Sequence, residues 1–262
     1  MQFSLDGKSV FAATGGRDLE SDEPVVIFVH GAGMDHTVFA MQARALAHHG
    51  RRVIAFDLPG HGQSAGPPLA SIEAMADWLL RAASACGAEH FRLAGHSMGA
   101  LVALEAAARG GTRVEALALL GVVPAMRVHP DLLAAARTNA RAAAALMTSW
   151  SFGAAGQRGG NPAPGLWLPG GAQRLLERAD ATSLAADLAA CDAYRGAMAA
   201  AGSVRCPVAL ILGGQDRMTP AAEGRRLGAS FAAARIEILE DAGHMMMLEQ
   251  PSATLALLRE VL

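Results

Sequence analysis

Six short apolar runs recur along the chain without the polar–apolar alternation that marks a strand with one exposed face. Uninterrupted runs of this length favour strands that are buried on both faces of a parallel sheet. Ahead of the first run, Asp6-Gly7 separates two shorter stretches, and this dipeptide is typical of the tight turn of a β-hairpin. The six runs occupy residues 25–29, 53–56, 91–94, 114–120, 208–212 and 236–239.

Helical patterns fill most of the spaces between these runs. Strands that alternate with helices, preceded by a hairpin, predict an open α/β sheet. With the hairpin included, the expected sheet has eight strands, is mostly parallel and is flanked by helices. The predicted helices cover residues 37–49, 72–86, 98–109, 220–227 and 252–262.

The alternation breaks once, because no strand-like run occurs between residue 120 and residue 208. Two Ala-rich stretches in this interval, at about 130–146 and 184–200, have helical composition instead. We interpret the insertion as a helical cap placed between two strands of the core. The predicted division is 1–123 and 204–262 for the α/β core and 124–203 for the cap.

A Gly/Pro-rich segment, residues 151–171, lies in the middle of the predicted cap. It is too long for a simple connection, so it is either a loop over a functional site or a plain linker. Trp150 and Trp167 favour the first interpretation, because buried indoles anchor structure.

Composition narrows the class of protein. The chain has 262 residues, of which 52% are hydrophobic, and this is ample for one large core with a cap. A net charge of −2 gives no electrostatic attraction to nucleic acid or to an anionic membrane surface. No apolar run is long enough to span a bilayer, and the first residues lack the pattern of a secretory signal. The three cysteines are odd in number and lack metal-type spacing, so we expect reduced thiols in a cytoplasmic protein.

The pentapeptide G-x-S-x-G occurs twice, at residues 95–99 and 62–66. The first copy follows an apolar strand and opens an Ala/Leu-rich helix, which is the context that a nucleophile elbow requires. The second copy has no strand leading into it, and Pro67-Pro68 after it disfavours a helical start. We therefore predict Ser97 as a nucleophile and Ser64 as an ordinary loop serine.

A serine hydroxyl needs a general base, usually histidine, and the histidine needs a carboxylate to orient it. Asp216 follows the run 208–212, and His244 follows the run 236–239. Both therefore lie at carboxyl ends of strands, where an open α/β sheet carries its site. Either residue alone would be an ordinary loop residue, but the order Ser97, Asp216, His244 predicts a catalytic triad.

An acyl-transfer site also needs backbone N–H groups for the developing oxyanion. The N–H of Met98, at the start of the predicted helix, is one candidate donor. The glycine-rich turn after the run 25–29 supplies the second, with Ala32 preferred and Gly33 as the other choice. Side chains expected to contact substrate are Gly33, Trp150, Trp167 and Met245, although the methionines after His244 fit a core role equally well.

Together these stretches resemble the α/β-hydrolase superfamily over essentially the whole chain. The resemblance rests on residues 30–33, 57–64, 95–99, 213–216 and 243–244. It implies a triad of Ser97, His244 and Asp216, an oxyanion hole formed by Ala32 and Met98, and a cap over the substrate pocket. It also implies structural roles for His30 and His61. The serine at position 97 excludes the branches of the superfamily that use an aspartate nucleophile.

The resemblance is strongest to small capped carboxylesterases, lactonases and carbon–carbon bond hydrolases that need no cofactor. The expected function is hydrolysis of an ester or lactone of a small to medium, largely apolar substrate through an acyl-serine intermediate. Alternatives are a carbon–carbon bond hydrolase acting on a ring-cleavage product and a non-catalytic ligand-binding protein on the same fold. No metal, cofactor, nucleic acid or membrane partner is expected. Three predicted cap arginines either meet an acidic substrate or lie on a solvated helix face: Arg137, Arg141 and Arg158.

Overall fold

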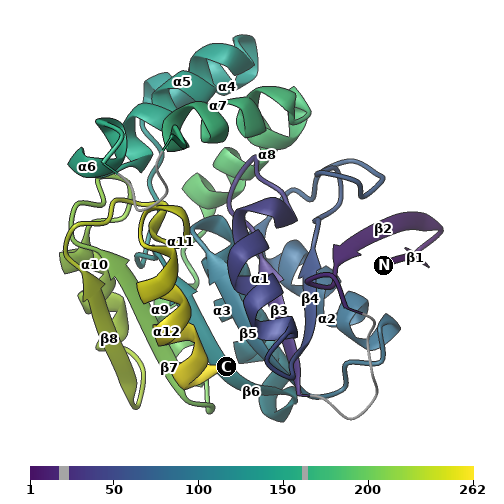
Figure 1. Ribbon diagram of the computed structural model, residues 1–262. Helices are drawn as coiled ribbons and strands as arrows, with labels where there is room; N and C mark the ends of the chain where they lie inside the picture. Colours follow the sequence, from purple (N-terminus) through teal and green to yellow (C-terminus); the bar gives the residue numbers. More distant parts are fainter. Residues whose placement is uncertain (18–23, 161–164) are drawn as a thin grey trace.

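The computed structural model describes residues 1–17, 24–160 and 165–262, which form one eight-stranded sheet with helices on both faces and a helical cap above it (Figure 1). The strand order is β1-β2-β4-β3-β5-β6-β7-β8. The strands are β1 (Gln2–Leu5), β2 (Lys8–Ala13), β3 (Val25–Val29), β4 (Arg52–Phe56), β5 (Phe91–His96), β6 (Val114–Leu120), β7 (Val208–Gly213) and β8 (Ala234–Leu239).

Pairing within the sheet follows the predicted pattern. In sheet order, the six strands from β4 to β8 are parallel to one another. Strands β1 and β2 form an antiparallel hairpin, and β2 also runs antiparallel to β4. Asp6 and Gly7 in the hairpin turn have φ values of 51° and 73°, as a two-residue primed turn requires. Every residue of β3 and β7 is buried, which explains why these strands appear in the sequence as uninterrupted apolar runs.

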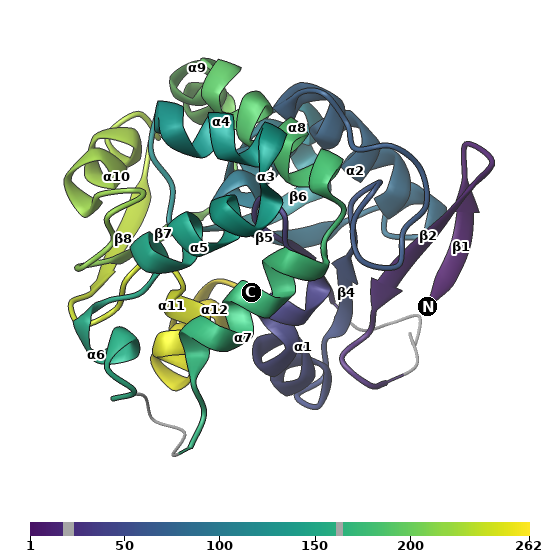
Figure 2. The same ribbon diagram turned by 90° about the horizontal axis from the view of Figure 1, so that it is seen from above.

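Helices cover the sheet on both faces (Figure 2). On one face, α1 packs against α12, and on the other α2 and α9 pack against α3, with α10 beside α9. The core helices are η1 (His36–Phe39), α1 (Ala40–Ala47), α2 (Ile72–Ala85), α3 (Met98–Gly110), η2 (Gly111–Arg113), α10 (Ala221–Gly228), α11 (Met246–Glu249) and α12 (Pro251–Val261). Among the helices that the structure describes, none has the length and hydropathy to cross a membrane.

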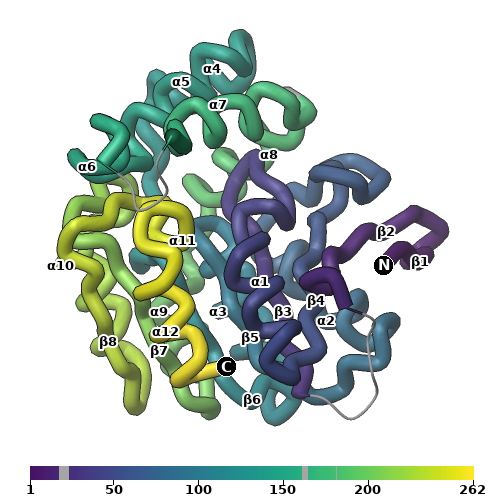
Figure 3. The backbone as a smooth tube through the Cα atoms, viewed as in Figure 1, coloured from purple at the N-terminus to yellow at the C-terminus, as the bar shows by residue number. Residues whose placement is uncertain are grey.

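Between β6 and β7 the described residues form six helices, and those of the cap lie above the carboxyl ends of the parallel strands (Figures 1 and 3). The six are α4 (Pro130–Thr138), α5 (Ala140–Ser151), α6 (Ala154–Gln157), α7 (Leu168–Arg178), α8 (Ala181–Ala193) and α9 (Ala197–Ser203).

Each Ala-rich stretch of the cap divides into two helices. Asn139 ends α4 and caps α5, its side chain accepting a hydrogen bond from Ala142 N–H. The second break falls at Tyr194, which has extended backbone and donates a hydrogen bond to Glu105 of α3. After this break α9 packs on α3 rather than above the sheet, so the last predicted cap residues lie beside the core helices.

The Gly/Pro-rich segment contains more helix than its composition suggests. Helix α6 forms after Gly153, and α7 begins at Leu168, where Pro169 occupies a first-turn position that needs no amide donor. The prediction of an irregular loop over residues 151–171 is therefore wrong for its two ends. Residues 161–164 lie outside the described part of the chain.

Candidate active site

Ser97 stands at a sharp turn between β5 and α3. Its backbone angles, φ 55° and ψ −121°, place it in a region that non-glycine residues rarely adopt. Holding a residue there costs on the order of 1–3 kcal/mol, which the surrounding structure must compensate. Such strain at the start of a helix, with the side chain facing a cavity, is the geometry of a nucleophile elbow.

The two glycines of the pentapeptide are required by close backbone approach. A Cβ atom on Gly95 would lie 2.1 Å from the carbonyl oxygen of Gly99. One on Gly99 would lie 2.3 Å from the carbonyl oxygen of Val29. Since these backbone neighbours cannot move without disturbing helix α3 or strand β3, the turn requires glycine at both positions.

Asp216 and His244 form a buried hydrogen-bonded pair. The Nδ1 atom of His244 lies 2.7 Å from Oδ2 of Asp216, and both side chains are almost fully buried. Because a carboxylate oxygen can only accept, His244 carries its proton on Nδ1. The second nitrogen, Nε2, is the acceptor in the neutral ring, and it is buried without a hydrogen-bond partner among the described residues.

Ser97 does not yet bond to this free nitrogen. Since Nε2 of His244 has no partner, the serine–histidine hydrogen bond is absent in this state. Catalytic hydrogen bonds often tighten only when substrate is bound. The structure therefore brings Asp216 and His244 together directly, and leaves Nε2 with an open acceptor lone pair.

Several hydrogen bonds keep Asp216 ionised. Burial by itself would raise the pKa of this carboxyl, but the charge and hydrogen bond of His244, with two bonds from Thr219, lower it overall. The Thr219 hydroxyl donates to Oδ2 at 2.5 Å, and the N–H groups of Met218 and Thr219 donate to Oδ1 at 2.8 Å. Thr219 was missed in the sequence, although an aspartate followed three residues later by threonine ahead of a helix is a recognisable turn pattern.

His96, inside the pentapeptide, orients the main chain of His244. Its Nε2 lies 2.9 Å from the carbonyl oxygen of His244, and the two rings are 4.6 Å apart. Burial, and then the proximity of His244, lower the pKa of His96 to about 3. A neutral His96 can donate from Nε2 to that carbonyl, so it packs and also fixes the loop that carries the base.

The first half of the cap holds the same loop. The carbonyl oxygen of Ser151 accepts hydrogen bonds from the N–H groups of His244 and Met245, at 2.7 and 3.1 Å. The buried carboxyl of Glu249 accepts from Gly153 N–H at 2.8 Å and from Gly243 N–H at 2.9 Å. We call these contacts the histidine-loop anchor; it fastens the end of α5 to the backbone of the predicted base.

Two backbone N–H groups beside Ser97 are free. Neither Ala32 N–H nor Met98 N–H donates a hydrogen bond to any described residue. Met98 is the first residue of α3, where the helix dipole favours negative charge. Gly33 differs, because its N–H donates to Oδ2 of Asp187 at 2.8 Å and is committed to that bond.

A cavity of about 350 Å³ opens above Ser97, between the core and the cap. Ala32 and Thr219 also line it, and most of the remaining wall is apolar. Two exposed arginines, Arg127 and Arg217, contribute to the wall, and no Asp or Glu among the described residues does so. The apolar part of the wall includes Met126, Val128, Leu132, Met147, Leu188 and Met218.

The predicted substrate contacts lie in different places. Trp150 lines the cavity above Ser97. Met245 is buried and lines a separate cavity with residues of α7, while Gly33 faces Leu184 and Leu176 of the cap. Trp167 is 65% exposed and lies outside the Ser97 cavity.

None of the three arginines predicted to face either substrate or solvent lines the Ser97 cavity. The Arg141 guanidinium lies 3.6 Å from the carboxylate of Glu177, and Arg158 donates to the backbone of Ala154. The cationic groups at this cavity come instead from Arg127 and Arg217.

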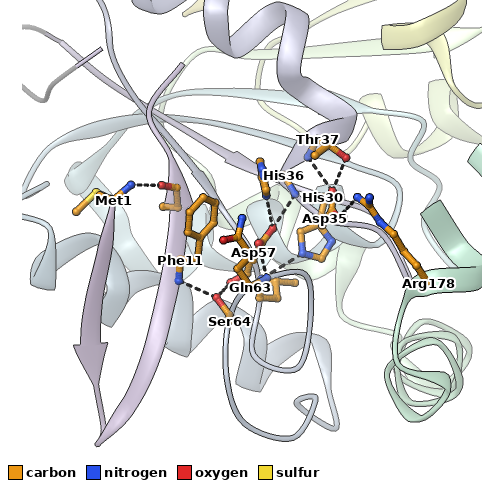
Figure 4. Close-up of polar contacts among 12 residues, drawn as sticks. Met1, Phe11, His30, Asp35, His36, Thr37, Asp57, Gln63, Ser64 and Arg178 are labelled. Carbon is orange, nitrogen blue, oxygen red and sulfur yellow. Dashed lines mark hydrogen bonds and ion pairs between the residues drawn. The ribbon is translucent and has the colours of Figure 1, made fainter. Parts of the chain in front are cut away.

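The second pentapeptide serine has a structural environment (Figure 4). Ser64 Oγ accepts a hydrogen bond from Phe11 N–H at 2.9 Å and donates one to the carbonyl oxygen of Asp57 at 2.7 Å. Its hydroxyl thus joins the loop after β4 to strand β2, and the Asp57 side chain is hydrogen-bonded to His36 and Gln63.

One group of side chains has the composition of a metal site. Ligand atoms of Asp35, His36 and Asp57 lie within 4.8 Å of one another. However, His36 already bonds to Asp57, and Asp35 accepts hydrogen bonds from Thr37 and from Arg178 (Figure 4). These contacts explain the cluster as a junction between the loop after β3, the loop after β4 and the cap.

A capped α/β sheet with a strained serine at a strand–helix turn, and an Asp–His pair beyond two later strands, defines the class of α/β-hydrolases. The sequence profile described as "Alpha/beta hydrolase family" matches residues 26–257, and the chain belongs to this family. The resemblance and the fold class predicted from the sequence are confirmed, as is the prediction of a hydrolase.

Relatives with assigned names are similar over most of the chain. The pimeloyl-[acyl-carrier protein] methyl ester esterase of Chromobacterium violaceum is 32% identical over 86% of this chain and 89% of that protein. The protein of the same name from Aromatoleum aromaticum is 29% identical over 92% and 98%. Among solved structures, the enol-lactonase from Burkholderia xenovorans LB400 superposes with a TM-score of 0.87 at 24% identity, covering 99% of this chain and 98% of that one; this shows a shared fold.

Proposed function

We propose that the protein is a serine hydrolase that cleaves a carboxylic ester or lactone through an acyl-serine intermediate. The observation that carries the proposal is the buried Asp216–His244 pair. Nε2 of His244 has no hydrogen-bond partner among the described residues, so it can accept a proton from a group outside the pair. The strained Ser97 and the free N–H groups of Ala32 and Met98 supply the other parts that acyl transfer needs.

The reaction has two balanced halves. Ser97 Oγ attacks the substrate carbonyl carbon while its proton passes to Nε2 of His244, and the N–H groups of Ala32 and Met98 stabilise the oxyanion. Collapse of this intermediate breaks the bond to the leaving alcohol, which takes the proton from His244. Water then attacks the acyl-serine by the same route, releasing the acid and restoring Ser97.

Asp216 acts through the histidine. It holds the Nδ1 proton of His244 and stabilises the imidazolium that forms during each half-reaction. Each N–H donor of the oxyanion hole is worth about 3 kcal/mol of barrier in comparable enzymes. We expect the two N–H donors and the Asp216–His244 pair together to supply most of the rate enhancement.

The cavity wall supports a small to medium substrate that is largely apolar. Its volume of about 350 Å³ and its methionine and leucine side chains suit an acyl chain or a compact ring. The exposed Arg127 and Arg217, with no acidic side chain in the wall, favour a negative group away from the scissile bond. The two relatives named above as esterases, and the lactonase of similar fold, support the choice of an ester or lactone.

The test is hydrolysis of short and medium p-nitrophenyl esters by the wild type and by Ser97→Ala. Activity that is present in the wild type and lost in the variant supports the proposal, and the order of rates ranks acyl length. Methyl hexanoate and monomethyl adipate form a matched pair for the charge of the substrate. A higher kcat/KM for the adipate that falls in Arg217→Gln supports the negative group, and a preference for the neutral ester refutes it.

Fluorophosphonate labelling separates the alternatives. Labelling of Ser97 without turnover of simple esters would favour a narrow substrate, such as the ring-cleavage product of a carbon–carbon bond hydrolase. A wild type that is neither active nor labelled would favour a ligand-binding protein and would refute the proposal. We further propose the cytoplasm as location, on the free cysteines. We propose residues 124–203 as the inserted unit, in which the helices before α9 form the cap and α9 packs on α3.

A further inference from the structure

Asp187 is a fully buried carboxylate that the proposed reaction does not use. It lies on α8, in the cap, and its side chain is 0% exposed. Its Oδ2 atom accepts a hydrogen bond from Gly33 N–H at 2.8 Å and lies 2.8 Å from Nε2 of His61. A buried charge is costly unless it is paired and hydrogen-bonded, so both contacts need an explanation.

Both partners of Asp187 come from loops of the core. Gly33 directly follows Ala32, the proposed oxyanion donor, and His61 lies in the loop after β4. Two neighbours on α8 reinforce the seat: the Ser183 hydroxyl donates to the carbonyl oxygen of Gly60 at 2.7 Å, and Leu184 packs against Gly33. We call these contacts the oxyanion-loop anchor.

The peptide that carries Ala32 N–H is held through its carbonyl group, because the Gly31 oxygen accepts a hydrogen bond from Met34 N–H at 3.2 Å and lies 2.9 Å from Nδ1 of His30. The next peptide, between Ala32 and Gly33, bonds among the described residues to Asp187 alone. Gly33 has φ 65°, so without that bond this second peptide can turn at low cost. A rotated Ala32–Gly33 peptide would direct a carbonyl oxygen, in place of the N–H, toward the carboxylate of Asp187. Repulsion between these oxygens disfavours that arrangement.

From these contacts we infer that Asp187 is a positioning residue, which holds Ala32 N–H in the oxyanion hole by fixing the peptide that follows it. The inference rests on the proposed function, since it assigns a task only within acyl transfer. A donor displaced by about 1 Å can cost on the order of 100-fold in rate. The cap therefore takes part in the reaction through α8 as well as shaping the cavity.

His61 balances the charge of Asp187. Its Nδ1 lies 3.0 Å from the carbonyl oxygen of Pro59, so both ring nitrogens face acceptors, and the ring must be doubly protonated to satisfy them. Burial lowers the pKa of His61, but its bond and charge interaction with Asp187 outweigh this and raise the pKa overall. The other groups that face or influence His61 are His30, whose ring lies 5.0 Å away, Asp57 and Asp180.

The same helix also lines the substrate cavity, through Leu188 and Cys191. A substrate that presses on this wall presses on the helix that holds the Ala32 loop. Poorly fitting acyl groups should therefore lower kcat as well as raise KM, because they disturb the donor that stabilises the transition state.

The test compares Asp187→Ala with Asp187→Asn on a short p-nitrophenyl ester, with active sites counted by fluorophosphonate labelling to completion. We expect Asp187→Ala to lose about 100-fold in kcat per labelled site with KM changed by less than about threefold. Asp187→Asn keeps an acceptor oxygen for Gly33 N–H and should lose less than about tenfold. Hydrogen–deuterium exchange of the peptide containing Gly33 should be slow in the wild type and faster in both variants.

A matched control is available on the same face of the cap. Arg178 of α7 forms an ion pair with Asp35 at 2.9 Å, which also joins the cap to the loop after β3 but contacts neither proposed donor. Arg178→Gln should leave kcat per site unchanged.

The inference is overturned if Asp187→Ala keeps its kcat per site, if only its KM rises, or if the Arg178 control loses as much. Should that variant not fold, fast exchange at Gly33 in the wild type, or an Asp187→Asn enzyme in which exchange at Gly33 is fast while kcat is unchanged, overturns it. A wild type without turnover or labelling would refute the proposed function itself, whereas an active wild type with unaffected variants refutes only the role of Asp187.

Discussion

Two copies of the same pentapeptide lie in this molecule, and their serines lie in opposite environments. Ser97 has a strained backbone, with φ 55°, and faces a cavity. Ser64 has no positive φ, and its hydroxyl makes two hydrogen bonds. Only the first serine stands between a buried strand and a helix. The comparison teaches that the letters G-x-S-x-G do not by themselves give the geometry of a nucleophile elbow; the strand before them and the helix after them do.

The largest expected contrast between the two serines is in activity. Ser97→Ala should lower kcat by about 10⁶-fold, since loss of a serine nucleophile costs about this much in a comparable triad. Ser64→Ala should keep kcat within a few-fold of the wild type, because its hydroxyl contacts only Phe11 and Asp57. Ester hydrolysis at matched active-site concentration measures both. A comparable loss in the two variants would remove the distinction.

The Asp216–His244 pair should affect the reactivity of Ser97 and not that of Ser64. Asp216→Asn should lower kcat by about 10⁴-fold, because an amide at this position favours the wrong tautomer of His244. The fold should persist, since the amide nearly matches the carboxylate in size. Turnover of the same ester gives the loss, and circular dichroism melting checks the fold. Turnover close to that of the wild type would contradict the proposed role of Asp216.

The order of the two serines should be reversed for stability, with the larger loss of unfolding free energy at Ser64. Ser64→Ala leaves the half-buried N–H of Phe11 without its acceptor, which should cost about 1 kcal/mol of unfolding free energy. For a chain of this size each kcal/mol shifts Tm by about 2–4 °C. Ser203→Ala is a control, because that exposed hydroxyl only bonds within its own helix. Equal melting of the Ser64 variant and the wild type would show that the hydroxyl is dispensable.

Compared with alanine, glycine should raise the stability at position 97 and lower it at position 64. At Ser97 glycine relieves strain worth about 1–3 kcal/mol and loses part of this gain to the entropy of the unfolded chain. A net gain of about 1 kcal/mol over Ser97→Ala is expected. At Ser64, where φ is not positive, glycine should be less stable than alanine by up to about 1 kcal/mol. Thermal melting of the four variants decides, and the same sign at both sites would exclude strain as the cause.

The smallest effect is a pH dependence confined to the loop of Ser64, which contains His61. The pKa of His61 is raised in the folded protein above its ordinary value of 6.5. Its contribution to stability is therefore complete below about pH 6.5 and is lost as pH rises through the folded pKa. The difference in unfolding free energy between wild type and His61→Gln should shrink from acidic to alkaline pH. A difference that is constant, or that grows with pH, would show the opposite sign of linkage.

The sequence was enough to predict where the candidate residues that directly follow strands would lie in the fold. Ser97, Asp216 and His244 each come just after an apolar run, and parallel strands deliver such residues to one edge of the sheet. Asp187 and Glu249 could not be found in this way. Each lies on a helix with no local motif, and its role depends on where that helix is seated. Asn139, which divides one Ala-rich stretch into two helices, was likewise hidden because the flanking composition is uniformly helical.

The histidine-loop anchor has a consequence for engineering and for how such enzymes diversify. The Ser151 carbonyl accepts from the N–H groups of His244 and Met245, and Gly153 N–H donates to Glu249, which also accepts from Gly243 N–H. The cap is therefore not an interchangeable module. A chimera with a foreign cap joined at the ends of β6 and β7 would have to recreate the Ser151 carbonyl contact and a hydrogen-bond donor to Glu249. Otherwise it would inherit a new pocket together with a misplaced histidine. Selectivity in this scaffold should therefore evolve more readily by single changes in the cavity wall than by exchange of whole caps.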